Sequence, residues 1–216
     1  MERPFLYVLA GVNGAGKSSI GGHLLRQEGL DWFNPDSYAR ALVQELGLPQ
    51  AEANAQAWHY GVDQLKAAIA AGRPHAFETT LGGASIAAML QEASRTHDVL
   101  VWFCGLSSPE QHMARVTARV AAGGHPISEA DIRRRWPRAQ HNLIHLMPVL
   151  AALQVYDNST EALPGTAVPD PTLLLQMADG CLEWPAADDL AQLQATPHWA
   201  EPLLEAALRC SGRAAP

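Results

Sequence analysis

The chain has few cysteines, few lysines and no long apolar run, and each shortage argues against a class of protein. Its three cysteines lie far apart and match no metal-binding or redox spacing. The 15 lysine and arginine residues are outnumbered by 22 aspartates and glutamates, which gives a formal net charge of −7. This charge argues against a general nucleic-acid-binding role, which requires a surplus of cations to neutralise phosphates. No apolar run approaches the length of a membrane span.

The start of the chain also lacks the basic and then apolar pattern of a secretory signal peptide. Residues 1–4 lead directly into an apolar run, so we expect a cytoplasmic protein that binds neither membranes nor nucleic acid. Hydrophobic residues make up 48% of the 216 residues and charged residues 17%, which is typical of a folded globular protein. One α/β domain is expected, because this length is sufficient to bury a full core.

The most informative motif lies near the start of the chain. Residues 11–18 read Gly-Val-Asn-Gly-Ala-Gly-Lys-Ser, which matches the P-loop pattern G-x-x-x-x-G-K-[ST]. An apolar run of strand length at 5–10 precedes it, and a stretch compatible with a helix at 18–27 follows it. The glycines let successive N–H groups point into one concavity, and the helix adds the positive end of its dipole.

The motif predicts a phosphate site with a metal ion. Lys17, one of only two lysines, is expected to reach the β- and γ-phosphates of a nucleotide, and the Ser18 hydroxyl is expected to hold Mg²⁺. The residues expected to bind the nucleotide are Gly11, Asn13, Gly14, Ala15, Gly16, Lys17, Ser18 and Ser19.

Strands and helices alternate along the first three quarters of the chain. Strands are expected at 5–10, 30–33, 74–80, 99–104 and 153–157, and helices are expected between them. This alternation predicts an α/β fold, a P-loop kinase with a five-stranded parallel sheet flanked by helices. Ligands of such sheets bind at the carboxyl ends of the strands. The P-loop, Asp36, Glu78 and Asn158 all follow strands and should therefore share one edge.

The last part of the chain is expected to extend the same domain. Residues 163–171 are rich in proline and glycine, residues 172–177 and 181–184 are expected to form a hairpin, and 197–208 a terminal helix. We therefore expect a P-loop kinase domain over 1–163 and an extension over 164–216 that packs on it. The extension is too short to fold as an independent domain.

Two acidic residues that follow strands are candidates for chemistry on an acceptor. Asp36 is the candidate base for a hydroxyl proton, or a ligand of Mg²⁺; a simple helix cap is the alternative. Glu78, with Thr80 close by, suits a hydroxyl-rich substrate; a surface glutamate beside a turn is the alternative. The strand at 99–104 is followed by Gly105 and has no acid at its end, so a Walker B aspartate is not evident. The metal is therefore expected to rely on Ser18, waters and one of these two carboxylates.

Positive charge is concentrated around a glycine-rich bend. Gly123 and Gly124 separate two expected helices, an arrangement that predicts an Arg-rich helical lid over the phosphates. A lid arginine can neutralise the charge that develops in phosphoryl transfer. Successive residues point about 100° apart on a helix, so at most two of three consecutive arginines can face the site. The remaining ones are expected to be solvated or paired with acids. The cluster comprises Arg115, Arg119, Arg133, Arg134, Arg135 and Arg138.

Two further residues have both a functional and a structural interpretation. His125, in the bend, is a candidate contact for substrate or phosphate, or a solvated loop histidine. Asn158 follows the fifth strand, where an adenine base lies in many P-loop kinases, although turn chemistry also explains it. His141 and His145 have helical i,i+4 spacing but lack a third metal ligand.

Taken in order, these motifs resemble the zeta-toxin family of P-loop kinases. The resemblance covers roughly residues 4–160 and depends on the ordered set more than on any single motif. It implies a kinase that uses ATP or GTP with Mg²⁺ and phosphorylates a hydroxyl of UDP-N-acetylglucosamine or a related nucleotide sugar. The motifs are Gly11–Ser18, Asn34–Asp36, Phe77–Thr80, Arg119–His125, Ile132–Arg135 and Tyr156–Ser159.

The resemblance also implies roles for single residues. Lys17 and Ser18 hold phosphates and metal, and Asp36 is the acceptor base. Glu78 and Thr80 contact the substrate. Arg119 acts with one of the three arginines at 133–135, for which Arg134 is our candidate.

Three points stay open at the level of sequence. An antitoxin protein is a candidate partner. Another small metabolite or a nucleoside is an alternative acceptor. A non-catalytic ATP-binding regulatory module is an alternative function.

Overall fold

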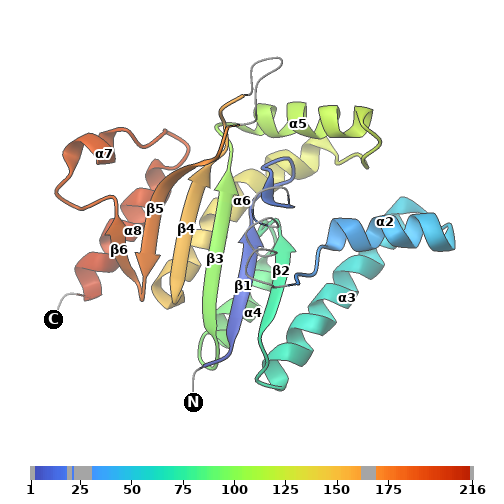
Figure 1. The fold of residues 1–216 in the computed structure, drawn as a ribbon, viewed down its shortest axis with the longest axis horizontal. Coiled ribbons are helices and arrows are strands. Elements are labelled where there is room, and N and C mark those ends of the chain that lie inside the picture. The colour runs from blue at the N-terminus through green and yellow to red at the C-terminus, as the bar shows by residue number, and fades with distance from the viewer. Residues whose placement is uncertain (1–2, 19–20, 22–30, 162–168, 215–216) are drawn as a thin grey trace.

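A computed structural model describes residues 3–18, 21, 31–161 and 169–214, without the side chains of residues 213 and 214. Six strands form one sheet in the order β2-β1-β3-β4-β5-β6. In Figure 1, α4, α6 and α8 lie behind this sheet, α5 lies above its upper edge, and α2 and α3 project beyond β2. The strands are β1 (Phe5–Ala10), β2 (His75–Thr79), β3 (Asp98–Gly105), β4 (Ala152–Asp157), β5 (Thr172–Ala178) and β6 (Cys181–Trp184).

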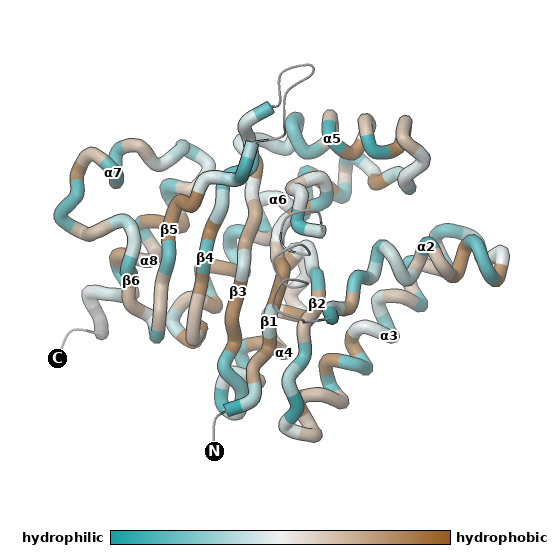
Figure 2. The backbone as a smooth tube through the Cα atoms, in the orientation of Figure 1, coloured by the Kyte–Doolittle hydropathy of each residue, from teal (hydrophilic) through white to brown (hydrophobic). Residues whose placement is uncertain are grey.

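Four of the strands form the parallel part of the sheet. β1 pairs in parallel with β2 and β3, and β3 pairs in parallel with β4. Leu6, Val8 and Leu9 of β1 have no exposed surface, as expected for a strand covered on both faces. Figure 2 shows the hydrophobic residues along β1, β3 and β5. The continuous apolar runs of the sequence are therefore the central strands.

The strand expected at 30–33 is not a full strand. Leu30 lies outside the described residues, and Phe33 forms a single parallel bridge with Phe77 of β2. The main-chain bonds of this bridge, Phe33 N to Ala76 O and Glu78 N to Phe33 O, are both 2.9 Å. Pro35 then begins α2, so the chain leaves the sheet at once. The parallel sheet therefore has four strands and one bridge where the sequence predicts five strands.

The helices begin with local signals that the sequence contains. Asn34, Ser108 and Ser128 accept a hydrogen bond from a main-chain N–H of the first turn of α2, α5 and α6. Within the described residues, no helix is long and apolar enough to cross a membrane. The helices are α2 (Pro35–Leu46), α3 (Gln50–Ala70), α4 (Ala84–Ala93), α5 (Pro109–Ala121), α6 (Glu129–Leu146), α7 (Leu190–Gln194) and α8 (Glu201–Ala214), with a 3-10 turn at Met147–Val149.

The C-terminal residues continue the same sheet. β5 pairs antiparallel with β4, and β6 pairs antiparallel with β5. Trp199 is 5% exposed, and its Nε1 donates to Asp157 Oδ1 at 3.2 Å. A β-carbon at Gly105 would lie 2.2 Å from Trp199 Cη2, so the indole packs directly on the end of β3. The hairpin and the indole therefore attach this part of the chain to the carboxyl ends of β3 and β4.

Replacing Trp199 tests whether this attachment stabilises the whole domain. We expect Trp199→Ala to lower the free energy of unfolding by about 3–5 kcal/mol, because it removes a buried indole and leaves a cavity. Trp58→Ala is the matched control and should lower the free energy of unfolding by less than about 1 kcal/mol, since Trp58 is 48% exposed. Urea unfolding followed by far-UV circular dichroism measures both. An equal loss in the two variants would contradict the attachment.

Candidate active site

The P-loop follows β1 and contains three glycines in conformations that other residues rarely adopt. Gly11, Gly14 and Gly16 have φ angles of 136°, 87° and 92°. A β-carbon at Gly11 would lie 2.1 Å from Cys104 O, and one at Gly14 would lie 2.8 Å from His112 O. Both the backbone conformation and the close approach therefore require glycine at these two positions.

Three side chains outside the loop hold its carbonyl groups. Cys104 Sγ and Asn158 Nδ2 both donate to Ala15 O, at 3.0 and 2.9 Å. His112 Nδ1 donates to Asn13 O at 2.8 Å, because a carbonyl oxygen can only accept. These contacts fix two carbonyls of the loop and so help to hold its backbone in place.

The supports of the P-loop are uncharged. Burial raises the pKa of the Cys104 thiol to about 12, so it stays a donor. Burial also lowers the pKa of His112 to about 4, so its ring is neutral at physiological pH. None of these three supports therefore adds a charge beside the P-loop. Asn158 belongs to this group, and the contact with a nucleotide base that the sequence predicts for it stays a prediction.

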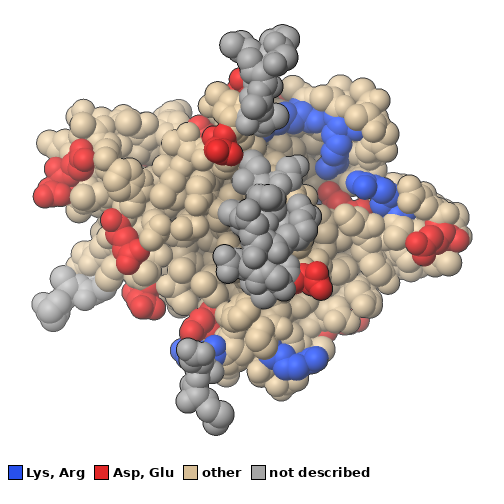
Figure 3. Space-filling model, viewed as in Figure 1, with Lys and Arg blue, Asp and Glu red and all other residues tan. Residues whose placement is uncertain are grey.

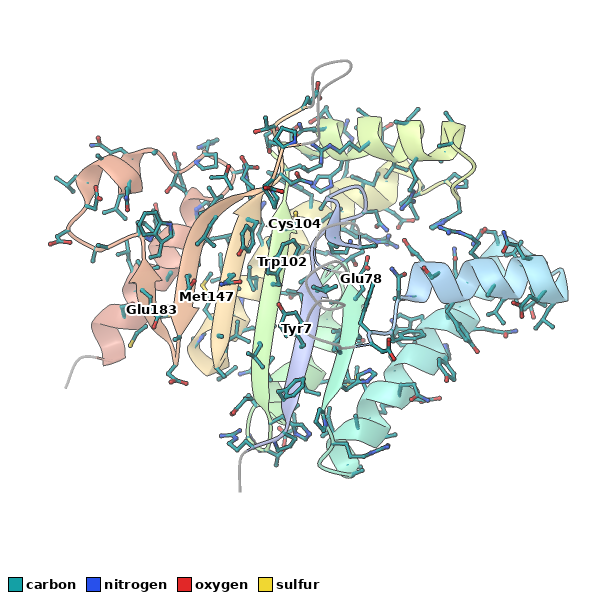
Figure 4. The ribbon with its side chains drawn as sticks, in the orientation of Figure 1. Tyr7, Glu78, Trp102, Cys104, Met147 and Glu183 are labelled. Carbon is teal, nitrogen blue, oxygen red and sulfur yellow. The ribbon has the colours of Figure 1, made fainter. Side chains whose placement is uncertain are left out.

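Glu78 connects the P-loop to the neighbouring strand. Glu78 Oε1 lies 3.4 Å from Lys17 Nζ, and both side chains are buried. Glu78 Oε2 accepts from Ser18 Oγ and from Asn34 Nδ2, each at 2.8 Å. Figure 4 shows Glu78 near the carboxyl end of β2, at the same edge of the sheet as Cys104 of β3. Ser19, which the sequence also predicts to bind the nucleotide, lies outside the described residues.

Asp36 lies in the first turn of α2, facing α5 and the bend that follows it. Its Oδ2 lies 3.7 Å from Arg119 Nη1, and its Oδ1 lies 3.7 Å from His125 Nε2. Arg119 Nη2 donates to His125 O at 3.1 Å, which holds the bend against the end of α5. The His125 side chain is 8% exposed and its Nε2 has no hydrogen-bond partner. Burial lowers the pKa of His125, although Asp36 opposes this shift.

The three consecutive arginines of α6 have different surroundings. Arg133 is exposed and pairs with Glu110 and Glu129, at 2.7 and 2.8 Å. Arg134 is also exposed and pairs with Asp131. Arg135 Nη1 donates to Asn13 Oδ1 of the P-loop at 2.7 Å. The arginine that contacts the P-loop is therefore Arg135, and not our candidate Arg134.

The helical phase of α6 contained a signal for this choice. Ile132, Ala139 and Leu143 are buried and form the face of α6 that packs on the domain. Arg135 follows Ile132 by three residues and precedes Ala139 by four, so it lies on this face. The spacing of the arginines alone could not decide between them. Their spacing from the apolar residues favours Arg135, and the packing of α6 on the domain decides the choice.

Thr79 and Thr80 hold the loop that follows β2. Thr79 Oγ1 accepts from Leu81 N at 3.1 Å, and Thr80 Oγ1 accepts from Gly82 N at 3.4 Å. Asn142 of α6 donates to Leu81 O at 2.7 Å and so fixes the same loop. Both threonine hydroxyls therefore have a structural partner, and both residues also line the cavity described next.

One cavity of about 500 Å³ brings several of the candidate residues together. Its apolar side includes Phe33, Trp58 and Phe77. Figure 3 shows basic side chains around a hollow between α5 and α2, with acidic atoms at its edge. Residues far apart in the sequence therefore share one site. The polar residues that line the cavity include Asn13, Asp36, Glu78, Thr80, His125 and Arg135.

Comparisons with known proteins identify the fold. No family model matches the chain, and no curated protein matches its sequence. Among solved structures, the complex of AvrRxo1-ORF1 and AvrRxo1-ORF2 with sulphate ions matches with a TM-score of 0.62 at 13% identity. That match covers 97% of this chain and 75% of the other. The same complex with ATP matches with a TM-score of 0.60 at 14% identity, over 95% of this chain and 64% of the other.

A second neighbour comes from another system. The PezAT chromosomal toxin–antitoxin system of Streptococcus pneumoniae matches with a TM-score of 0.54 at 17% identity. The match covers 73% of this chain and 68% of the other. At such identities the likeness concerns the fold alone. The six-stranded, mostly parallel sheet with the P-loop motif after β1 is therefore an α/β fold shared with these solved structures.

Proposed function

We propose that the protein is a phosphotransferase that moves the γ-phosphoryl group of ATP or GTP to a hydroxyl of a small molecule. The observation that carries this proposal is that Asn13 of the P-loop and Asp36 line the same cavity. Asn13 lines it from the P-loop, Asp36 lines it from α2, and His125 lines it from the bend after α5. A donor phosphate on the P-loop and an acceptor in the cavity would therefore be neighbours, as phosphoryl transfer requires.

The donor half consists of Lys17, Ser18 and the N–H groups of the P-loop. A fold neighbour, the AvrRxo1-ORF1 complex, has been solved with ATP. The donor set suits Mg²⁺, which binds proteins through one or two carboxylates together with substrate phosphates. Ser18 is exposed, and two carboxylates, Asp36 and Glu78, line the adjoining cavity. When bound, Mg²⁺ would supply neutralisation of charge on the β- and γ-phosphates.

The acceptor half has Asp36 as its base. In the proposed reaction, Asp36 takes the proton of the acceptor hydroxyl, and the hydroxyl oxygen forms a bond to the γ-phosphorus. The bond between this phosphorus and the bridging oxygen breaks, and the nucleoside diphosphate leaves with the electron pair. The distances of 3.7 Å from Asp36 to Arg119 and His125 are longer than hydrogen bonds. The carboxylate therefore has room to accept one from a substrate.

Arg119 and Arg135 are the proposed stabilisers of the phosphoryl group. Arg119 lies at the end of α5 beside Asp36, and Arg135 reaches the P-loop at Asn13. Arg134 is held by Asp131 at the exposed side of α6. We therefore assign to Arg135 the role for which Arg134 is the candidate at the level of sequence.

The proposed acceptor is UDP-N-acetylglucosamine or a related nucleotide sugar. A cavity of about 500 Å³ lies within the range of roughly 300–1,000 Å³ that accommodates ligands larger than one sugar ring. Its apolar side suits a planar base, and Glu78, Thr80 and His125 suit sugar hydroxyls. One fold neighbour is a complex of AvrRxo1-ORF1 with AvrRxo1-ORF2, and the other belongs to a toxin–antitoxin system. We therefore also propose an antitoxin-like protein as a partner to test.

Transfer of labelled phosphate to an acceptor tests the proposed function. We expect the protein with ATP and Mg²⁺ to label a nucleotide sugar from a panel of nucleotide sugars, sugars and nucleosides. Lys17→Ala should lose this transfer by at least about 1,000-fold, because its ammonium contacts the transferring group. The matched control is Lys66→Ala, which removes an exposed lysine of α3 and should transfer normally. Tight ATP binding without transfer to any acceptor would contradict the function.

Asp36→Asn tests the base. We expect kcat to fall by about 100- to 10,000-fold, because an amide cannot take the hydroxyl proton, while the affinity for ATP stays the same. Glu45→Gln, at an exposed position of the same helix, is the control. Steady-state kinetics and equilibrium ATP binding measure the two effects. Full transfer by Asp36→Asn would refute the base assignment and leave the phosphotransferase proposal intact.

Paired substitutions of the two arginines test the assignment of Arg135. Arg135→Met should lower kcat by about 1,000-fold or more, whereas Arg134→Met should change it by less than about threefold, since a surface ion pair contributes little. Both side chains are replaced by the same residue, so helix propensity is matched. If Arg134→Met were the more damaging, the role would return to Arg134.

A further inference from the structure

The strand that supplies an acid to the metal in many P-loop proteins has none at its end here. In such proteins Mg²⁺ is held by the P-loop hydroxyl and by an aspartate at the end of a neighbouring strand. The neighbour β3 ends at Gly105, and the residue before it is Cys104. Cys104 Sγ already donates a hydrogen bond to Ala15 O. A second protein ligand for the metal must therefore come from another element.

The other neighbour of β1, which is β2, has an acid one residue before its end. β2 pairs with β1 on the side opposite β3, and Glu78 of β2 is in register with Leu9 of β1. Glu78 is 7% exposed. Its Oε2 lies 2.8 Å from Ser18 Oγ. This carboxylate therefore already touches the hydroxyl of the P-loop to which a cation would bind.

The surroundings of Glu78 also suit a carboxylate that binds a cation better than one with a purely structural role. Burying a carboxylate is costly unless it is paired, and Lys17 Nζ at 3.4 Å is its partner. Asn34 Nδ2 at 2.8 Å fixes the orientation of Oε2. Lys17 is also the group expected to contact the γ-phosphate, so phosphates in the P-loop would compete with Glu78 for it. When Lys17 also contacts the phosphates, a cation beside Glu78 would compensate the negative charge of the carboxylate.

Asp36 has no such relation to the P-loop. Its two carboxylate oxygens lie 3.7 Å from Arg119 and His125. These are the ion-pair partners of Asp36 within the described part of the chain. Asp36 is also more open, with 36% of its side chain exposed. The two carboxylates of the cavity therefore differ, and the one in contact with Ser18 is Glu78.

We propose that Glu78 is the protein carboxylate of the divalent-cation site, supplied from β2 in place of an acid at the end of β3. Asp36 then serves as the acceptor base alone, and Asn34 is a positioning residue for Glu78. This inference depends on the proposed function, because the cation site is completed by nucleotide phosphates. It changes the role of Glu78 from a substrate contact to a metal ligand.

Metal binding, measured without turnover, tests the inference. The probe is a non-hydrolysable ATP analogue with Mn²⁺, followed by electron paramagnetic resonance, and with Mg²⁺ or EDTA, followed by calorimetry. We expect Glu78→Gln to weaken Mn²⁺ binding to the protein–nucleotide complex by about 10- to 100-fold. The Mg²⁺-dependent gain in nucleotide affinity should be lost with it. Affinity in EDTA should be unchanged or higher, because Lys17 no longer has a competing partner.

Two further variants separate the possible roles. Asp36→Asn should keep the Mn²⁺ affinity and the Mg²⁺-dependent gain of the unmodified protein. Glu78→Asp keeps the charge beside Lys17 and guards against misfolding of the glutamine variant. We expect it to bind Mn²⁺ with an affinity between those of the unmodified protein and Glu78→Gln. Thermal melting by circular dichroism establishes that each variant is folded.

The outcomes distinguish this inference from the proposed function. If Glu78→Gln or Glu78→Asp is folded and binds Mn²⁺ like the unmodified protein, Glu78 is not a metal ligand. A rise in the KM of the acceptor, without any change in metal binding, would return Glu78 to the substrate site. If Asp36→Asn loses Mn²⁺ affinity and Glu78→Gln does not, the inference is refuted and the phosphotransferase proposal stands. If the unmodified protein binds no nucleotide with or without a metal ion, both fail together.

Discussion

The buried ion pair between Lys17 and Glu78 is the contact on which the rest of the site depends. It joins the P-loop, which follows β1, to the end of β2, and both side chains are almost completely buried. Removing one partner of such a pair leaves an uncompensated buried charge, at a cost of about 3–5 kcal/mol. Asn34 binds the same carboxylate and also caps α2. The direction in which α2 leaves the sheet is therefore fixed by the same group that pairs with Lys17 of the P-loop.

The remaining supports of the P-loop come from the other side of β1. Cys104 of β3, Asn158 after β4 and His112 of α5 each hold a carbonyl of the loop. All three are neutral, so the positive charge at the loop comes from basic side chains such as Lys17 and Arg135. This local positive charge is what the proposed anion site requires in a chain with a net charge of −7.

Much of the fold could be predicted from local patterns, and the failures have local causes. The apolar runs, glycines and caps predicted β1, β2, β3 and β4 and most helix starts, because strands covered on both faces are continuously apolar. The expected strand at 30–33 was wrong: Asn34 and Pro35 start a helix so early that a single bridge at Phe33 remains. α7 had no signal of comparable strength, since it is only five residues long.

The sequence by itself determined the P-loop motif, the order of the elements and the edge of the sheet at which Asp36 and Glu78 lie. These follow from the P-loop motif, the spacing of apolar residues and the direction of the strands, which are properties of short segments. Only the tertiary structure decided which arginine of α6 reaches the P-loop and which carboxylate touches Ser18. Arg135 is directed inward because Ile132, Ala139 and Leu143 pack on the domain and so set the rotation of the helix. Glu78 meets Ser18 because β2 is hydrogen-bonded to β1 in one particular register, and contacts between distant segments depend on such packing rather than on the segments themselves.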